Sequence, residues 1–421
     1  MSAQRGSSLL SMGAVAEVEF DPTDPRTWFM IQHRENQGLD RIEITAQFHD
    51  HSMTLAGIPA SKFYYDARTT VNVMAAVAAY YGFDSGRASF DIYNIEAEAM
   101  GAKMIYADNA MPTIDFRAPL VKGPDDLAKL KPPDWLTTAR APYALDVTKL
   151  NTRMGANRGL FCAPFSLAVG VRSYPKLIRD MKRDPKFAHE IFTRLVDDVL
   201  PSYLQTQKDY CGVTMALGAD AWSAFPNVPP EMHEEWVVPY AMRLFQNCQS
   251  FGVMALTVAA ADYCEERIER FDKQILFNLL DIQSKLFGGT PTFFLGMGRL
   301  VDLPLEPLVE YLDAYKEKDV QASLTAGINA RLLRDGPVEK IVESVKRYID
   351  VLGRDHNLSV WLANIPADAP PEHIHAAVAA THTYGQRPIA ENLDEIEVQV
   401  PERESFQEYA DKMSEGAGLG I

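Results

Sequence analysis

Short apolar runs, rich in β-branched and aromatic residues, alternate with longer helical patterns through most of this 421-residue chain. The candidate strands are residues 89–93, 159–163, 212–216, 252–257, 275–280, 292–296, 319–324 and 358–363. Helical patterns fill most of the gaps, at residues 186–208, 229–250, 305–317, 337–352 and 370–384. A strand followed by a helix, repeated, requires right-handed crossovers and a parallel sheet, and eight repeats close that sheet into a barrel. The pattern therefore predicts an α/β fold, a (β/α)8 TIM barrel.

A doubly wound open sheet is the alternative arrangement for this pattern. No Gly-rich phosphate-binding loop follows the first candidate strand, which favours the barrel. Helix boundaries are well marked, because Pro-Pro-Glu stretches begin the patterns at 229–231 and 370–372, and Gly82 ends a helix predicted over residues 68–82. In such a barrel the functional residues lie on the loops at the carboxyl ends of the strands.

Both ends of the chain differ from the middle. Residues 1–60 are irregular and include Pro22, Pro25 and the cluster His49-Asp50-His51, so we expect an N-terminal arm that packs against the main body. Residues 61–385 form the expected barrel. Residues 386–421 are acidic, contain few large aliphatic side chains and are expected to form a C-terminal tail.

Composition excludes several classes of function. The formal charge of −16 and the lack of a basic patch argue against nucleic-acid binding. No apolar run approaches the roughly 18 residues of a membrane helix, and the first residues do not resemble a signal peptide, so a cytoplasmic protein is expected. The four cysteines are far apart and suit a reducing compartment. There is no Ser/His/Asp signature, GxSxG, Walker loop or HExxH to indicate a hydrolase or kinase.

The first candidate strand leads into polar residues. Alternation places Asp91 between Phe90 and Ile92, where its carboxylate is expected to face the barrel mouth and act as a general acid or base. Asn94 and Glu96 follow and are candidate substrate-binding residues. The alternative for Glu96, and for Glu98 beyond it, is a solvated helix face.

The third candidate strand ends in Gly218-Ala219-Asp220-Ala221-Trp222. Gly218 is expected to permit a tight turn, Asp220 to place a catalytic carboxylate at the mouth, and Trp222 to form a flat apolar wall. A plain loop aspartate that caps a turn is the alternative for Asp220. Phe165, just past the second candidate strand, is expected to line the same pocket.

The fourth candidate strand is followed by Asp262-Tyr263-Cys264-Glu265-Glu266. Asp262 is a third catalytic candidate and Tyr263 a substrate-binding one, although helix-start acids are the simpler interpretation. His49 and His51 alternate like two metal ligands but lack a fixed third, so we interpret them as surface or satisfied polar side chains. His373 and His375, at a helix start, are expected to be solvated.

Several of these stretches together resemble the uroporphyrinogen decarboxylase superfamily, which includes corrinoid-linked methyltransferases of the methylcobalamin:coenzyme M and chloromethane types. The segment 163–168 (APFSLA) resembles the family's G-P-[FW]-T-L-A stretch. It is followed, in the family's order, by similar stretches at 177–185, 218–220, 230–240 and 369–373. The resemblance covers roughly residues 40–385 and implies the (β/α)8 barrel.

The two branches of the family differ at particular positions. Asp91 matches an aspartate of the decarboxylases, but their active-site Tyr and His fall on Gly170 and Ala363, and their substrate-binding arginines have no clear counterpart. Residues 96–101 (EAEAMG) resemble the E-A-E-A-x-G stretch of the methyltransferases. Porphyrinogen decarboxylation is therefore not expected, and the resemblance implies the methyltransferase branch.

Zinc-dependent members of that branch hold the metal with His-x-Cys after the fourth strand and a Cys after the eighth. The corresponding positions are approximately Leu256, Val258 and Ala363, which offer no donor atom. We therefore expect no zinc at the family position and an acceptor that is not a thiol. No metal ligand is assigned.

The resemblance implies an enzyme that moves a methyl group between a small organic compound, such as a methoxylated aromatic or a sterol-like molecule, and a protein-bound corrinoid. The chain has no D-x-H-x-x-G corrinoid-ligating motif, so cobalamin is expected to arrive on a separate corrinoid-binding protein. A homodimer is a further expected assembly. Two alternatives stay open: a decarboxylase or related lyase on a non-porphyrin substrate, and a non-catalytic barrel subunit.

Overall fold

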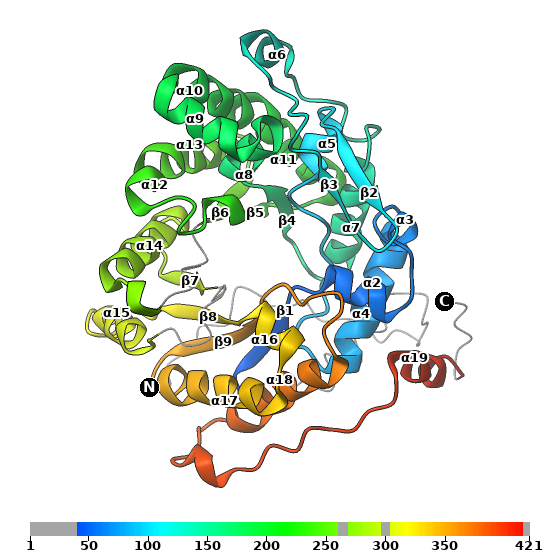
Figure 1. Cartoon of the computed structure of the whole chain (residues 1–421), viewed down its shortest axis with the longest axis vertical. Helices are drawn as coiled ribbons and strands as arrows, with labels where there is room; N and C mark the ends of the chain where they lie inside the picture. Colours follow the sequence, from blue (N-terminus) through cyan, green and yellow to red (C-terminus); the bar gives the residue numbers. More distant parts are fainter. Residues whose placement is uncertain (1–39, 260–267, 296–303, 416–421) are drawn as a thin grey trace.

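The computed structural model describes residues 40–259, 268–295 and 304–415, and parallel strands surrounded by helices dominate it (Figure 1). Hydrogen bonding joins the parallel strands in two groups, with the orders β1-β9-β8-β7 and β4-β5-β6. Figure 1 shows the two groups facing each other around one axis with the helices outside them. The strands are β1 (Glu43–Ala46), β4 (Gly159–Cys162), β5 (Met215–Asp220), β6 (Met254–Ala259), β7 (Thr292–Leu295), β8 (Ser323–Ile328) and β9 (Asn357–Leu362).

A separate antiparallel hairpin, β2 (Met104–Ala107) and β3 (Ala110–Ile114), lies between β1 and β4 in the chain. The helices before it are α2 (His49–Leu55), α3 (Ala60–Phe63), α4 (Ala67–Tyr81) and α5 (Ile95–Ala99). Those from the hairpin to β6 are α6 (Pro124–Lys129), α7 (Ala141–Arg153), α8 (Pro164–Arg172), α9 (Tyr174–Arg183), α10 (Pro185–Arg194), α11 (Leu200–Cys211), α12 (Pro230–Trp236) and α13 (Val238–Gln249). After β6 come α14 (Lys273–Leu286), α15 (Glu306–Lys316), α16 (Ala330–Asp335), α17 (Val338–Tyr348), α18 (Pro371–Tyr384) and α19 (Phe406–Glu415).

Three predicted strands begin later than expected, and the residues that close the preceding helices explain the shift. The predicted runs 212–216, 252–257 and 319–324 correspond to β5, β6 and β8. Gly212, Gly252 and Asp319 have φ values of 77°, 80° and 56°. Gly212 is the C-cap of α11, and Gly252 and Asp319 lie in the turns that follow α13 and α15, so the extended backbone starts only afterwards.

Two predicted strands are not formed. Residues 275–280 lie inside α14, because Asp272 accepts hydrogen bonds from the amides of Gln274 and Ile275 and begins a helix there. The apolar run is one face of that helix, with Leu276, Leu279 and Leu280 buried among others. Residues 89–91 pair with no strand and are followed by a turn at 92–94, and the Asp91 side chain is in an ion pair with Arg140.

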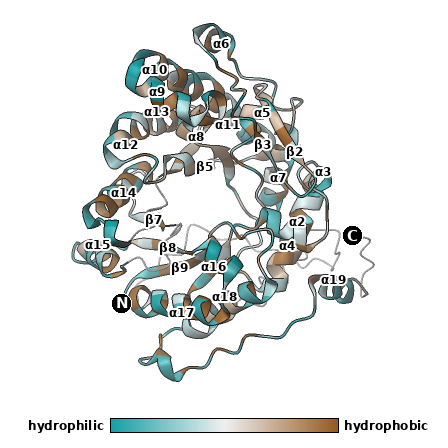
Figure 2. Cartoon of the chain, viewed as in Figure 1, coloured by the Kyte–Doolittle hydropathy of each residue, from teal (hydrophilic) through white to brown (hydrophobic). Residues whose placement is uncertain are grey.

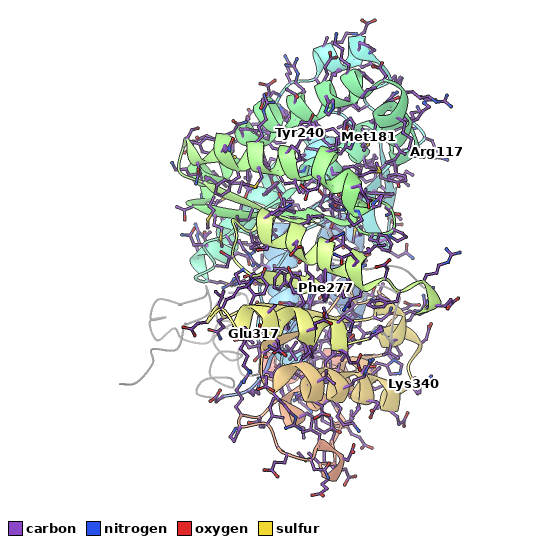
Figure 3. The ribbon with its side chains drawn as sticks, turned by 90° about the vertical axis from the view of Figure 1, so that its left-hand side faces the viewer. Arg117, Met181, Tyr240, Phe277, Glu317 and Lys340 are labelled. Atoms are coloured by element: carbon purple, nitrogen blue, oxygen red, sulfur yellow. The ribbon has the colours of Figure 1, made fainter. Side chains whose placement is uncertain are left out.

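The helix predictions are confirmed. The helix predicted over 68–82 is α4, in which Asp66 caps the first turn and Gly82 ends the helix in the left-handed conformation. The long pattern at 186–208 is α10, a π-helical turn η1 (Leu195–Val199) and α11 in succession. Figure 2 shows helices with hydrophobic and hydrophilic faces around the strands. In Figure 3, Phe277 lies on α14, and its ring packs on Tyr311 of α15 with centroids 5.1 Å apart.

Part of the expected arm contributes to the sheet. Strand β1 and helix α2 both lie within residues 1–60, and β1 pairs with β9 from Glu43–Ser359 to Ala46–Leu362. In the expected tail, α19 packs against α4, where Tyr80 contacts the rings of Phe406 and Tyr409. No helix among the described residues is long and apolar enough to cross a membrane.

Candidate active site

The barrel strands have one buried face and one partly exposed face. In β5 the even-numbered residues are buried and the odd-numbered ones keep some exposure, and β9 alternates in the same way. A Cβ placed on Gly159 would collide with Gln207 of α11, so the buried face is the one that packs on the helices. The partly exposed face therefore turns toward the barrel axis. It is apolar at Leu160 and Leu217, and on β8 and β9 it carries Thr325 and Ser359 beside Trp361.

Asp220 is the last residue of β5, at the carboxyl end of the strands, and like the other even-numbered residues of this strand it is on the buried face that packs on the helices. Its Oδ1 atom accepts hydrogen bonds from the amide and hydroxyl of Ser166, at 3.0 and 2.5 Å, in the first turn of α8. Its Oδ2 atom is buried and has no partner among the described residues. Burial raises the pKa of Asp220 to about 7, although the hydrogen bonds from Ser166 act in the opposite direction. The side chain therefore holds a proton for part of the time near neutral pH.

Glu96 places a second buried carboxyl group behind β4. Its Oε1 atom accepts a hydrogen bond of 2.8 Å from the amide of Cys162, and its Oε2 atom has no partner among the described residues. Burial raises its pKa to about 8, so Glu96 is mainly neutral at pH 7. Burial, with smaller effects of Glu96 and Asp220, also raises the pKa of the Cys162 thiol, which is therefore not a thiolate. The solvated position considered for Glu96 is not what the structure shows.

Trp222 lies in the turn after β5 and belongs to an aromatic cluster. Its ring stacks on Tyr174 with centroids 5.4 Å apart and an interplanar angle of 24°. Phe116 meets the same ring edge-on at 5.6 Å. The Trp222 amide donates to Ser166 Oγ at 3.2 Å, so the hydroxyl that contacts Asp220 also positions the tryptophan. The hydroxyl of Ser166 therefore contacts both the carboxyl group of Asp220 and the backbone of Trp222.

Asp91 occupies a different environment from the one expected. Both of its carboxylate oxygens accept hydrogen bonds from Arg140, at 2.8 and 2.7 Å, and its side chain has no exposed surface. Arg140 also donates to Glu98 at 2.7 Å, and the backbone amide of Asn94 donates to the Asp91 carbonyl. Asp91 is therefore buried in an ion pair rather than directed into the mouth, and a catalytic role for it stays a prediction.

Phe165 is also displaced from the expected pocket. It is fully buried, and its ring packs against Phe192 of α10 with centroids 5.9 Å apart. It belongs to the core between α8 and α10.

Gly218 lies within β5 rather than in a turn, and a Cβ there would be 2.5 Å from the Phe161 ring. Because glycine has no side chain, position 218 leaves room for the Phe161 ring.

The remaining candidates fall outside the described residues or differ from expectation. Asp262, Tyr263 and Cys264 lie outside the described residues. The side chains of Leu256, Val258 and Ala363 carry no metal-ligating atoms, and the absence of zinc at the family position stays a prediction. Within the three described ranges, no group of three or more His, Cys, Asp or Glu side chains could hold a metal.

The histidines belong to the packed interior. His49 hydrogen-bonds Ser89 at 2.5 Å and His51 hydrogen-bonds Tyr81 at 2.7 Å, so both are satisfied polar side chains. His373 and His375 are buried, which corrects the expectation that they are solvated. His375 packs against the ring of Tyr80 and against that of Tyr81 at 4.8 Å, because the buried face of α18 meets α4.

Three residues of this region were not singled out from the sequence. Ser166 lies in the APFSLA stretch, and its central position between Asp220 and Trp222 depends on the contact of β5 with α8. Arg140 and Tyr174 lie in segments with no distinguishing pattern. Only the tertiary contacts show their importance.

Comparisons with known proteins agree with this architecture. The family model of uroporphyrinogen decarboxylase (URO-D) matches residues 43–384. A methylated-thiol–coenzyme M methyltransferase of Methanosarcina mazei is 27% identical over 204 residues, which are 47% of this chain and 53% of that protein. A uroporphyrinogen decarboxylase of Myxococcus xanthus is 31% identical over 101 residues, or 23% of this chain and 28% of the relative. The alignments thus span about half or less of these curated relatives.

A solved structure shows the same fold. It is a methyltransferase from Methanosarcina mazei, with a TM-score of 0.62 and 16% sequence identity over 86% of this chain and 98% of the other. This neighbour supports the barrel predicted from the strand and helix pattern. The family model covers most of the chain, from β1 through α18. The chain therefore belongs to the uroporphyrinogen decarboxylase (URO-D) family.

Proposed function

We propose that this protein is a methyltransferase that moves a methyl group between a small organic compound and a corrinoid carried by a separate protein. The observation that carries the proposal is the similarity to the methylated-thiol–coenzyme M methyltransferase within a shared family. The EAEAMG stretch at 96–101 supports the same branch. The sequence has no corrinoid-ligating motif, which is why we assign the cofactor to a partner.

Asp220 is the proposed acid of the reaction. When a methyl group leaves oxygen or sulfur, the electron pair of the broken bond stays on that atom, which then takes up a proton. A carboxyl group with a pKa of about 7 can donate this proton near neutral pH. The corrinoid, when bound, supplies the cobalt that takes the methyl group. Asp262, just past β6, remains a second candidate acid.

The aromatic cluster supports a flat organic donor. Trp222 and Tyr174 are both partly exposed and stacked, and such surfaces suit planar ligands. A methoxylated aromatic therefore fits better than a small aliphatic donor, and a sterol-like compound is the other donor with a flat apolar body. The apolar residues at the zinc positions give no support to a thiol acceptor.

The test is a demethylation assay with the purified chain, free Co(I) cobalamin and a methoxylated aromatic such as 2-methoxyphenol. We expect loss of the Co(I) absorbance together with release of catechol, and no turnover without cobalamin. Asp220→Asn should slow turnover by about 100-fold, the usual scale for loss of a general acid. Asp198→Asn, on the exposed surface of the η1 turn, is the matched control and should retain activity.

Two results would overturn the proposal. Release of carbon dioxide from a carboxylated substrate without cobalamin would support the decarboxylase alternative, which the short similarity to a uroporphyrinogen decarboxylase also suggests. Failure of free cobalamin, methoxylated aromatics and methylated thiols to support any turnover would favour a non-catalytic barrel subunit.

A further inference from the structure

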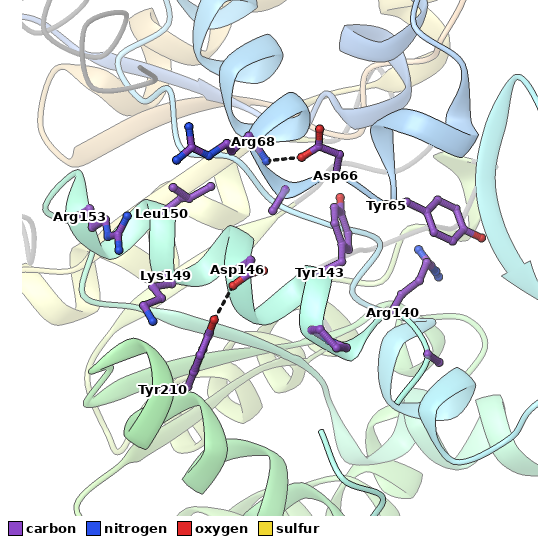
Figure 4. Close-up of a pocket in the computed structure, with 13 residues that line it drawn as sticks. Tyr65, Asp66, Arg68, Arg140, Tyr143, Asp146, Lys149, Leu150, Arg153 and Tyr210 are labelled. Atoms are coloured by element: carbon purple, nitrogen blue, oxygen red, sulfur yellow. Dashed lines mark hydrogen bonds between the residues drawn. The ribbon is translucent and has the colours of Figure 1, made fainter. Parts of the chain in front are cut away.

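A groove of about 610 Å³ lies on the outside of the barrel, between the N-terminal part of α4, helix α7 and the end of α11. Its volume is in the range of sites that bind small organic molecules. Figure 4 shows Arg68, Lys149, Leu150 and Arg153 on one side of this groove and Tyr65 on the other. We call it the α4–α7 groove.

Cationic side chains outnumber acidic ones in this groove. Arg68, Arg140, Lys149 and Arg153 line it, together with Asp66 and Asp146. Arg140 is already engaged by Asp91 and Glu98. The structure shows no ion pair for Arg68, Lys149 or Arg153 with any described residue. In a chain with a formal charge of −16, this local surplus of positive charge is distinctive.

The two acidic residues of the groove make hydrogen bonds to neutral donors, and the structure shows no ion pair between them and these cations. Asp66 caps α4, where its side chain accepts hydrogen bonds from the Arg68 amide at 3.1 Å and the Thr69 hydroxyl at 2.8 Å. Asp146 accepts a hydrogen bond of 2.8 Å from the Tyr210 hydroxyl. The Lys149 ammonium lies 3.8 Å from the centroid of the Tyr210 ring, a cation–π contact that leaves its positive charge available to an anion.

The groove also has an apolar part. Tyr65 is 46% exposed and Tyr210 is 36% exposed, and both are large side chains that usually avoid such exposure. Leu150 and Pro142 contribute further apolar surface. Exposed aromatic surface beside unpaired cations is typical of a site that holds a ligand with an apolar body and a charged end.

We propose that the α4–α7 groove binds a small aromatic anion, with its carboxylate or phosphate group on Arg68, Lys149 and Arg153. Its ring lies along the side chains of Leu150, Pro142 and Tyr65. Guanidinium groups bind both kinds of anion through paired hydrogen bonds, so the shared chemistry is an aromatic ring with an anionic substituent. The site lies outside the barrel and is separate from the proposed methyl-transfer site.

Isothermal titration of the full chain with phenyl phosphate and with benzoate tests this proposal and distinguishes the two anions. We expect one site per chain for at least one of them, with a dissociation constant that rises with salt. The double variant Arg68→Gln/Arg153→Gln should weaken that binding by at least about tenfold, because two charge-assisted hydrogen-bonding groups are lost. Phenol and inorganic phosphate should each bind at least about tenfold more weakly than phenyl phosphate.

Arg183→Gln is the matched control, because Arg183, like Arg153, is an exposed arginine in the last turn of a helix. It should bind phenyl phosphate and benzoate like the unaltered chain. Both substituted arginines of the double variant are exposed, so its thermal melting should match that of the control. Absence of binding to the unaltered chain, equal binding by the double variant, or equal binding of phenol would overturn the proposal.

Discussion

Single buried carboxyl groups behave differently in this protein according to their partners. Asp91 is fully paired by Arg140, whereas Glu96 and Asp220 each keep one oxygen without a partner among the described residues. Burial raises the pKa of all three carboxyl groups, but at Asp91 the charge and hydrogen bonds of Arg140 act against this rise, and Glu96 and Asp220 have no such cationic partner. The three acids are therefore expected to respond differently to substitution.

The Asp91→Asn substitution tests a structural role against a catalytic one. If Asp91 is a general acid or base, as its position in the predicted strand 89–93 suggests, the substitution should reduce turnover by at least about 100-fold with little change in stability. The ion pair predicts instead a loss of about 3–5 kcal/mol in the free energy of unfolding, because Arg140 would be left with half of its buried charge partners. Urea denaturation decides between them. An inactive variant of unchanged stability would restore Asp91 to the chemistry.

Glu96→Gln is expected to change how stability depends on pH. The folded-state pKa of Glu96 is raised to about 8, so the folded protein keeps a proton that the unfolded chain releases above about pH 4.5. The stability that this proton provides is present at low pH and is lost as the pH rises toward 8.

Gln keeps an oxygen to accept from the Cys162 amide and cannot ionise. Relative to the variant, the unaltered protein should therefore lose up to about 1.4 kcal/mol per pH unit between pH 5 and 8. Denaturation midpoints at pH 5, 6.5 and 8 measure this difference. A constant difference at all three values would show that Glu96 does not titrate in this range.

At the level of elements, the pairing of β4 with β5 is shaped by one glycine. Gly218 pairs with Phe161, and any Cβ at position 218 would be 2.5–3.1 Å from three atoms of the Phe161 ring. Asp220 follows Gly218 on the same strand and Ser166 lies in the helix after β4, so this packing also places the proposed acid. The interface therefore links core packing to the candidate active site.

Gly218→Ala should destabilise the protein by about 1–3 kcal/mol, the usual effect of overpacking a core. It should also reduce activity, because β5 would move relative to α8. The double variant Phe161→Leu/Gly218→Ala removes the collision and should recover part of the stability. Thermal melting of both variants gives the result, and an unchanged midpoint for the single variant would contradict the packing argument.

At the scale of the whole molecule, residues 404–409 near the C-terminus pack against α4. Tyr80 is 2% exposed and donates a hydrogen bond of 2.7 Å to the Glu404 carbonyl. Its ring contacts Phe406 and Tyr409 with centroids 5.6 and 5.3 Å apart. Chain segments more than three hundred residues apart are thus held together by one aromatic cluster.

Phe406→Ala should lower the free energy of unfolding by about 1.5–3 kcal/mol, because Phe406 is 3% exposed and its burial is lost. Gln407→Ala, at the exposed neighbouring position, should have little effect. Denaturant titration followed by tyrosine and tryptophan fluorescence provides the measurement. Equal stability of the two variants would mean that the segment contributes no packing energy.

Local signals in the sequence determined the type of fold and most helices. Gly82 marked the end of α4, and Pro230 and Pro371 began α12 and α18, because a glycine cap and a proline act through their own backbone. Short apolar runs predicted β4, β7 and β9, because such a run is also a local feature of the sequence. The repeated order of strands and helices, combined with the handedness of crossovers, was enough to predict a barrel.

Only the tertiary structure decided which side chains meet. An apolar run can be a strand or a helix face, so 275–280 became part of α14 once Asp272 capped it. The partner of Asp91 is Arg140, forty-nine residues away, and no local pattern connects them. The positions of Asp220, Ser166 and Trp222 depend on the meeting of β5 and α8. Burial and pairing are properties of the assembled barrel, because they depend on neighbours that are distant in the chain.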